Sequence, residues 1–185
     1  MRPPLPDLNA LTSEQRAIYE DILAGPRGRL DPPLAVWLNS PGLARTAQEL
    51  GSFCRNGTSL PPRLSELAIL ITGSWWRASF EWAVHAPIAI AAGLDEAVVE
   101  QIRKGIRPDF SAQDELCVYD FASELLNERR ISDPVYAAAE AALGTTGVVD
   151  LVGILGYYGL ISMTLNAFQI PAPGDARPFF EHRAQ

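Results

Sequence analysis

The chain has 185 residues, 48% of them apolar, and a net charge of −7. This length and apolar content suit one sizeable core and argue against a second, so we expect a single domain over residues 1–185. The negative charge disfavours nucleic acid as a partner, because such a surface needs clustered positive charge to neutralise phosphates.

The chain opens with a proline-rich segment, residues 1–10, which we expect to be an extended N-terminal arm. Thr12 to Gln15 has the pattern of a capping box and predicts a helix with apolar residues at helical spacing. Gly25 is expected to end this helix, because glycine is common where helices stop.

A loop is expected at residues 25–33, which are rich in glycine and proline. We expect its arginines, Arg27 and Arg29, to be solvated, although a loop of this kind can reach over a pocket. Ser40 followed by proline then predicts the start of a helix over residues 40–55.

Six further helices follow from the apolar spacing and the caps, and no segment shows the period-two alternation of a strand. We therefore predict an all-α protein of about seven to nine helices. Their expected ranges are 61–75, 79–92, 95–104, 112–129, 133–143 and 146–168. Asp95, Ser111 and Ser132 are the expected N-caps, and Gly93, Gly105 and Gly144 the expected C-caps.

The last of these helices carries four glycines in an apolar sequence. Glycine in a helix interior costs about 1 kcal/mol relative to alanine, so close helix contact is the expected compensation. We expect helix 146–168 to be central, with Tyr157 and Tyr158 beside the contact, and able to line a pocket or a subunit interface.

Targeting signals are not expected. Residues 1–7 lack the apolar stretch of a secretory signal, and the apolar runs are interrupted before the roughly 20 residues of a membrane span. Cys54 and Cys117 have neither metal-ligand nor disulfide-framework spacing, and we expect buried, inert thiols. These features predict a soluble, cytoplasmic protein without a membrane partner.

The segment 64–93 holds the polar residues that best indicate chemistry. Glu81 and His85, four residues apart, share one helix face, so the carboxylate can hold and polarise the imidazole. Glu66 lies in a helix that is apolar nearly all round, and its charge needs a partner there, for which His85 is the candidate. These three form the predicted catalytic group, whereas His182, near a charged terminus, is expected to be solvated.

Ligand-binding residues are harder to assign from sequence. Two glutamates and one histidine without a second nearby histidine argue against a metal, and no cofactor is expected. Arg63 is the candidate for holding a substrate carboxylate through its guanidinium fork, with a surface salt bridge as the alternative. Trp76 and Trp82 are candidates to wall a pocket, although core packing is the commoner role of such rings.

These motifs resemble a known family. Leu60-Pro-Pro-Arg-Leu-Ser-Glu-Leu-Ala-Ile-Leu, then Glu81-Trp-Ala-Val-His85 and Ala91-Ala-Gly-Leu94, resemble the carboxymuconolactone decarboxylase family, which includes the alkylhydroperoxidase AhpD group. The resemblance covers about residues 60–105. It implies an AhpD-like helical domain that forms a homo-oligomer: a dimer, trimer or hexamer.

The chain combines features of two branches of that family. In the peroxidase branch a Cys-x-x-Cys pair precedes the histidine, but Ala78 and Glu81 stand at those positions here, so peroxidase activity is not expected. Glu66 resembles the glutamate that feeds protons to those cysteines. Glu81 with His85 resembles the Glu-x-x-x-His pair of the decarboxylase branch.

The expected function is a cofactor-independent lyase resembling γ-carboxymuconolactone decarboxylase, acting on a small carboxylated lactone or keto acid from aromatic-compound degradation. His85 would be the general acid/base, with Glu81 tuning it and Glu66 completing a proton relay. The alternatives are a hydrolase or hydratase acting on a related small molecule, and a non-redox AhpD-like ligand-binding protein.

Overall fold

The computed structural model describes residues 5–174, and all regular structure in that range is helical. The all-α prediction is confirmed. The helices of the described range are α1 Ser13–Ala24, α2 Pro32–Trp37, α3 Pro41–Asn56, α4 Pro62–Trp75, α5 Ser79–Ala91, α6 Glu96–Arg103, α7 Gln113–Glu128 and α8 Asp133–Phe168.

Local sequence sets most helix boundaries. The Thr12 side chain accepts from the Gln15 N–H while the Gln15 side chain accepts from the Thr12 N–H, so the predicted capping box is present. Asp95 caps α6 by accepting a backbone N–H. The helix expected over 112–129 has Ala112 at its N-cap rather than Ser111.

The sequence analysis missed one helix, α2. The loop expected over 25–33 ends two residues early, because Pro32 begins α2. Proline fits the first turn of a helix, where its missing N–H would have no partner. The break expected between the helices 133–143 and 146–168 is present: both lie within the bounds of α8, and Gly144 between them has φ of +70° and ψ of 167°, which are not helical values.

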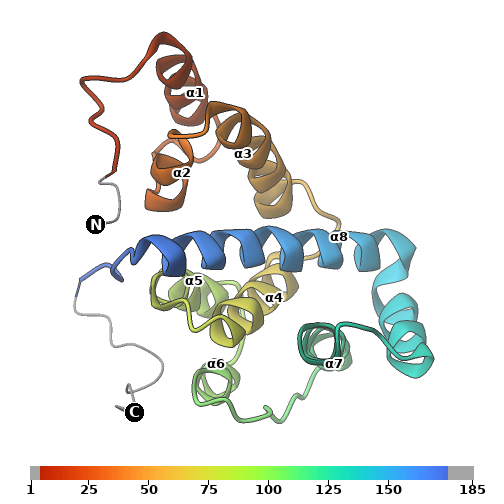
Figure 1. Ribbon diagram of the computed structural model, residues 1–185. Coiled ribbons are helices and arrows are strands. Elements are labelled where there is room, and N and C mark those ends of the chain that lie inside the picture. The colour runs from red at the N-terminus through yellow and green to blue at the C-terminus, as the bar shows by residue number, and fades with distance from the viewer. Residues whose placement is uncertain (1–4, 175–185) are drawn as a thin grey trace.

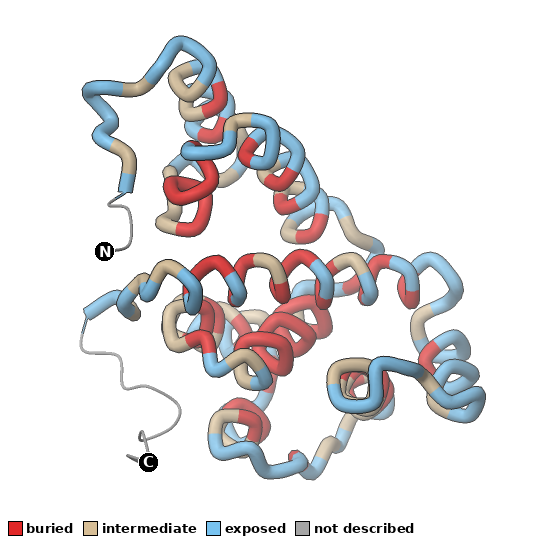
Figure 2. The backbone as a smooth tube through the Cα atoms, in the orientation of Figure 1, coloured by how far each residue is buried: buried red, intermediate tan, exposed pale blue. Residues whose placement is uncertain are grey.

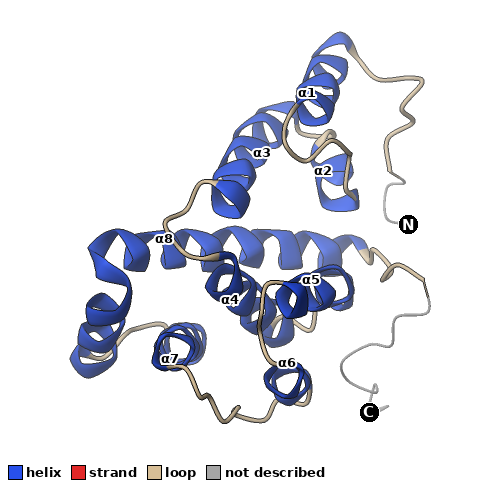
Figure 3. Cartoon of the chain, turned by 180° about the vertical axis from the view of Figure 1, so that it is seen from behind, coloured by secondary structure: helices blue, strands red, loops and turns tan. Residues whose placement is uncertain are grey.

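Helix α8 is the axis of the molecule. Helices α1 to α3 lie on one side of it and α4 to α7 on the other, as the two opposite views show (Figures 1 and 3). It packs against α2, α3, α4 and α7, and most of its inward positions are buried (Figure 2). The predicted central position is therefore confirmed.

Helix α8 is also long and apolar enough to cross a membrane, judged by length and composition alone. However, 67% of its most apolar window is buried inside the protein. Core helices of globular proteins combine the same composition with the same burial.

Polar contacts anchor α8 to the segments on both sides. Asp150 accepts two hydrogen bonds from Ser59, one from the backbone N–H and one from the hydroxyl, each 2.7 Å long. The Trp37 indole donates to the Thr164 hydroxyl at 2.9 Å. Hydrogen bonds to a charged group contribute about 1.5–3 kcal/mol, so the Asp150 contacts help to fix the register of α8 beside the α3–α4 connection.

Gly51 on α3 lies directly against Tyr157 of α8, and Gly51→Ala should destabilise the fold by about 1–3 kcal/mol through overpacking. A Cβ there would overlap the Tyr157 ring and hydroxyl. That ring is held edge-on between Trp37 and Tyr158, so it has little room to move. Urea denaturation followed by circular dichroism measures the change.

Gly42→Ala, on the same helix, is the matched control. A Cβ at Gly42 meets nothing within 4 Å. Its stability should be unchanged or raised by up to about 1 kcal/mol, because alanine is the better helix former. Equal stability of the two variants would contradict tight packing of α3 on α8.

Candidate functional site

The three predicted catalytic residues meet in the interior. Glu66 comes from α4, and Glu81 and His85 come from α5; all three side chains are buried. His85 Nδ1 lies 2.7 Å from Glu66 Oε2, and His85 Nε2 lies 3.3 Å from Glu81 Oε2. The imidazole is therefore placed between two carboxyl groups.

The two contacts of the imidazole differ in quality. The one to Glu66 is a hydrogen bond, whereas the one to Glu81 has ion-pair distance but lacks the alignment of a hydrogen bond. Glu81 Oε2 is left as a buried oxygen without a hydrogen-bond partner. Burial raises the pKa of Glu81, and the nearby His85 offsets only part of that effect.

The hydrogen bond to Glu66 determines the chemistry open to His85. An ionised carboxylate can only accept, so with Glu66 ionised the Nδ1 atom carries a proton. Nε2 is then the atom that exchanges protons, either with Glu81 or with a bound molecule. A protonated Glu81 can resupply it.

A small cavity, called here the inner cavity, adjoins this cluster. Its volume is about 20 Å³, which suits about one water molecule. Its polar lining includes Glu81 and His85 from α5, Tyr157 and Tyr158 from α8, and Arg27 from the loop before α2.

The two tyrosines connect the imidazole to α8. The His85 ring packs edge-on against Tyr158 with a centroid distance of 5.2 Å, and Tyr158 packs in the same way against Tyr157 at 5.3 Å. Burial raises the pKa of Tyr157 to about 12, although the nearby charge of Arg27 lowers it. The Tyr157 hydroxyl, near Arg27 but outside hydrogen-bonding geometry, is a second buried polar group without a partner.

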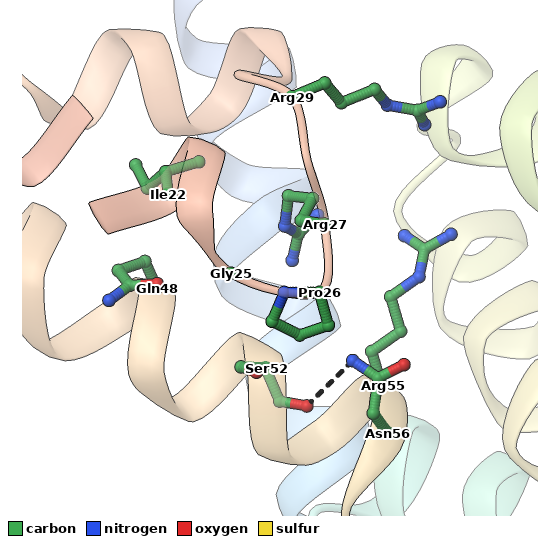
Figure 4. A pocket seen from close by; sticks show the side chains of 9 residues that line it. All are labelled: Ile22, Gly25, Pro26, Arg27, Arg29, Gln48, Ser52, Arg55 and Asn56. Atoms are coloured by element: carbon green, nitrogen blue, oxygen red, sulfur yellow. Dashed lines mark hydrogen bonds between the residues drawn. The ribbon is translucent and has the colours of Figure 1, made fainter. Parts of the chain in front are cut away.

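A larger cavity, called here the outer cavity, lies next to the inner one and shares Arg27 and Arg55 with it. Its volume is about 140 Å³, and Figure 4 shows the side chains that surround it. It is lined by Ile22, Gly25, Pro26, Arg27, Arg29, Gln48, Ser52, Arg55 and Asn56. Sequence reasoning missed Arg55. It expected Arg27 and Arg29 to be solvated, which holds for Arg29, whose side chain is 61% exposed, but not for Arg27 at 16%. The one useful signal was that a loop of this kind can reach over a pocket.

The three residues expected to bind substrate lie elsewhere. The Arg63 guanidinium is held by Asp114 and Glu115 at the start of α7, which is the salt bridge named above as its alternative. Trp76 packs edge-on against the preceding tryptophan, and Trp82 belongs to the hydrophobic core. None of the three lines the inner or the outer cavity.

Both cysteines are buried and free, as expected. Burial, with a contribution from Asp150, raises the pKa of Cys54 to about 11, so its thiol stays protonated and weakly reactive. Within residues 5–174, no three or more His, Cys, Asp or Glu side chains are grouped so that they could hold a metal ion. His182 lies outside the described residues.

Comparison with known proteins supports the fold. No family model and no curated protein matches the chain. Among solved structures, it is similar to an uncharacterized peroxidase-related protein from Silicibacter sp. TM1040, with a TM-score of 0.72 over 96% of this chain and 93% of that chain, at 12% sequence identity. At this identity the likeness shows a shared fold, in agreement with the expected AhpD-like helical architecture.

Glu81→Gln should make the protein more stable at neutral pH. Because burial raises the pKa of Glu81 in the folded state, the folded protein binds more protons than the unfolded chain between the unfolded and folded pKa values. Stability of the natural protein therefore falls as pH rises through that window, by up to about 1.4 kcal/mol per pH unit. Glutamine carries no charge, so the stability of the Glu81→Gln variant does not fall with pH for this reason.

Thermal denaturation between pH 4 and pH 8 measures the effect. The advantage of Glu81→Gln should be small at pH 4 and grow as pH rises above the ordinary glutamate pKa. Glu49→Gln, at an exposed position on α3, is the control and should show no such growth. A Glu81→Gln variant that is less stable than the natural protein at pH 7 would mean that Glu81 is an ionised partner of a charged His85.

Proposed function

We propose that this protein is a cofactor-independent acid/base enzyme resembling γ-carboxymuconolactone decarboxylase, acting on a small carboxylated lactone or keto acid. The observation that carries the proposal is the buried imidazole of His85, held at Nδ1 by Glu66 and lining a cavity together with Glu81. Titratable groups brought together in this way are frequent in active sites.

The cluster suits the proton step of a decarboxylation. When the bond between the carboxylate carbon and the substrate skeleton breaks, CO2 leaves and the electron pair is delocalised into the lactone or keto carbonyl. A proton from His85 Nε2 then completes the new C–H bond, and a protonated Glu81 can restore that proton. Such general acid catalysis typically contributes about 10²- to 10⁴-fold in rate.

Peroxidase chemistry has less support. The structural neighbour is named as peroxidase-related, but that name describes the neighbour alone. By the family resemblance, Ala78 and Glu81 stand where that branch has its two cysteines. Cys54 and Cys117, the two cysteines of this chain, are buried, and neither lines the inner cavity.

Hydration or hydrolysis is the second candidate, and the size of the inner cavity favours it. A space for about one water, beside the unpartnered oxygens of Glu81 and Tyr157, can hold a water for His85 to activate. The two reactions differ in product: decarboxylation releases CO2, whereas hydration adds the elements of water.

His85→Gln should lower turnover by about 10²- to 10⁴-fold with little change in melting temperature. Glutamine keeps an amide that can donate to Glu66 but cannot transfer a proton. Turnover is measured on a panel of γ-carboxylated lactones and β-keto acids, with CO2 release and NMR of the product in D2O. Glu66→Gln, a positioning change, should alter the pH profile of turnover as well as its rate.

Arg45→Gln, on the exposed side of α3, is the control and should keep full activity. Unchanged turnover in His85→Gln would exclude His85 as the proton-transferring group. A peroxidase assay supplies an organic hydroperoxide and a dithiol donor. Hydroperoxide consumption that is lost in Cys54→Ser or Cys117→Ser would indicate a redox function instead.

A homo-oligomer is part of this proposal, and the outer face of α8 supports it. Val149, Val152 and Met163 on that face are 65%, 46% and 44% exposed. A Cβ at Gly153 or Gly156 would meet nothing within 4 Å, so packing within the subunit does not require glycine there. An apolar face with two small residues can accept a helix from a second copy.

Light scattering at micromolar concentration should give the mass of a dimer, trimer or hexamer, and Val149→Lys should lower that mass. Charge in an apolar interface is costly unless it is paired. Ile106→Lys, at another exposed apolar position, is the control. A natural protein that runs at its monomer mass of 20.1 kDa would refute the assembly.

A further inference from the structure

We propose that the outer cavity is the subsite that holds the carboxylate of an organic acid. Arg55 is the principal residue that binds the carboxylate, and Arg27 and Arg29 contribute further positive charge. The inference rests on the proposed function in one respect, which is that the rest of the bound acid faces the catalytic cluster. The carboxylate-binding role differs from the sequence expectation, which assigned it to Arg63.

The three arginines converge from two parts of the chain. Arg27 and Arg29 belong to the loop between α1 and α2, and Arg55 lies in the last turn of α3. All three line the outer cavity, and the guanidinium groups of Arg29 and Arg55 reach the same side of it (Figure 4). Guanidinium groups on one cavity are the usual way in which proteins bind carboxylates.

The positive charge of this cluster is only partly balanced. Asp31 accepts from both Arg27 and Arg29, at 3.0 and 2.7 Å, so a single carboxylate serves two cations. The half-buried side chain of Arg55 makes no hydrogen bond or ion pair within the described residues. Since burying charge is costly without a partner, and the whole chain carries −7, this local excess of cations points to an anionic ligand.

An independent observation comes from the inner cavity. Tyr157 is 2% exposed, and its hydroxyl has no partner although it lines the cavity that shares Arg27 and Arg55 with the outer one. Buried hydroxyls are normally hydrogen-bonded, so an orphan in this place indicates a group that arrives with the ligand or a water. A ligand held by the arginines therefore lies close enough to serve this hydroxyl directly or through the one water that the inner cavity can hold.

The lining favours an organic acid over inorganic phosphate. Ile22 and Pro26 give the outer cavity apolar walls, and Phe80, Leu34 and Ile161 do the same for the inner one. A free phosphate ion would gain nothing from such walls. An acid with a short apolar body matches both the cations and the walls.

Binding of the anion also changes the proton balance of the cluster. The charge of Arg55 lowers the pKa of Glu81, opposing the effect of burial. A carboxylate that neutralises Arg55 removes that influence, so Glu81 holds its proton more firmly while the acid is bound. Charge recognition in the outer cavity and proton supply in the inner one are coupled in this way.

The test is isothermal titration of the full chain at low ionic strength with benzoate, benzamide and inorganic phosphate. Benzoate and benzamide share a shape and differ in charge. Benzoate should bind at least about 10-fold more tightly than benzamide or phosphate, because the pairing is charge-assisted and uses the apolar walls. Arg55→Gln should weaken benzoate binding by at least about 10-fold, Arg29→Gln by less, and the control Arg45→Gln not at all.

Four outcomes overturn the subsite: no benzoate binding at millimolar concentration, equal binding of benzamide, phosphate binding as tight as that of benzoate, or unchanged affinity in Arg55→Gln. His85→Gln separates this proposal from the proposed function, because it should bind benzoate normally. Benzoate binding that depends on Arg55, in a protein whose turnover ignores His85, would keep the subsite and reject the acid/base enzyme. Turnover that depends on His85, in a protein whose benzoate affinity is unchanged in Arg55→Gln, would keep the acid/base enzyme and reject the subsite.

Discussion

The burial of two carboxyl groups and one imidazole between α4, α5 and α8 is the constraint on which the arrangement of the site depends. Each of these groups would be costly in an apolar interior by itself, so Glu66, Glu81 and His85 must lie together. Their meeting fixes the rotation of α4 and α5 relative to each other, and the Tyr158 ring then fixes α5 against α8. The contacts that position the helices are the same ones that the proposed proton transfer would use.

Hydrogen bonds satisfy the Glu66 side of the cluster but not the Glu81 side. This difference bears on whether the cluster binds a ligand. Glu66 and His85 form a full hydrogen bond, which a purely structural pair would also form. Glu81 and Tyr157 each keep a buried oxygen without a partner beside an open space, which costs stability. Sites that bind small molecules often retain such groups, because the ligand or a water satisfies them.

The sequence predicted the all-α fold and the meeting of Glu66 with His85 for a physical reason: a lone carboxyl in an apolar helix requires a partner, and few were available. For Arg63 it offered a carboxylate ligand or a salt bridge, and the structure shows the salt bridge, with two acidic residues at the start of α7 that closeness in sequence does not reveal. It did not find Arg55, since nothing local shows that the end of α3 reaches the loop before α2. Contacts between distant segments depend on helix packing, which periodicity alone does not give.

The site divides its tasks between the two sides of α8. Helices α4 and α5 supply the residues proposed to transfer protons, whereas α3 and the loop before α2 supply Arg55, Arg27 and Arg29 (Figure 1). The loop bearing Arg27 and Arg29 lies outside the hydrogen bond between Glu66 and His85, so its sequence can change without disturbing that bond. If the proposed roles hold, the anion that is accepted could change without loss of the Glu66–His85 pair. Tyr157 and Tyr158 of α8 line the inner cavity together with residues of both groups, so a substitution there would affect both.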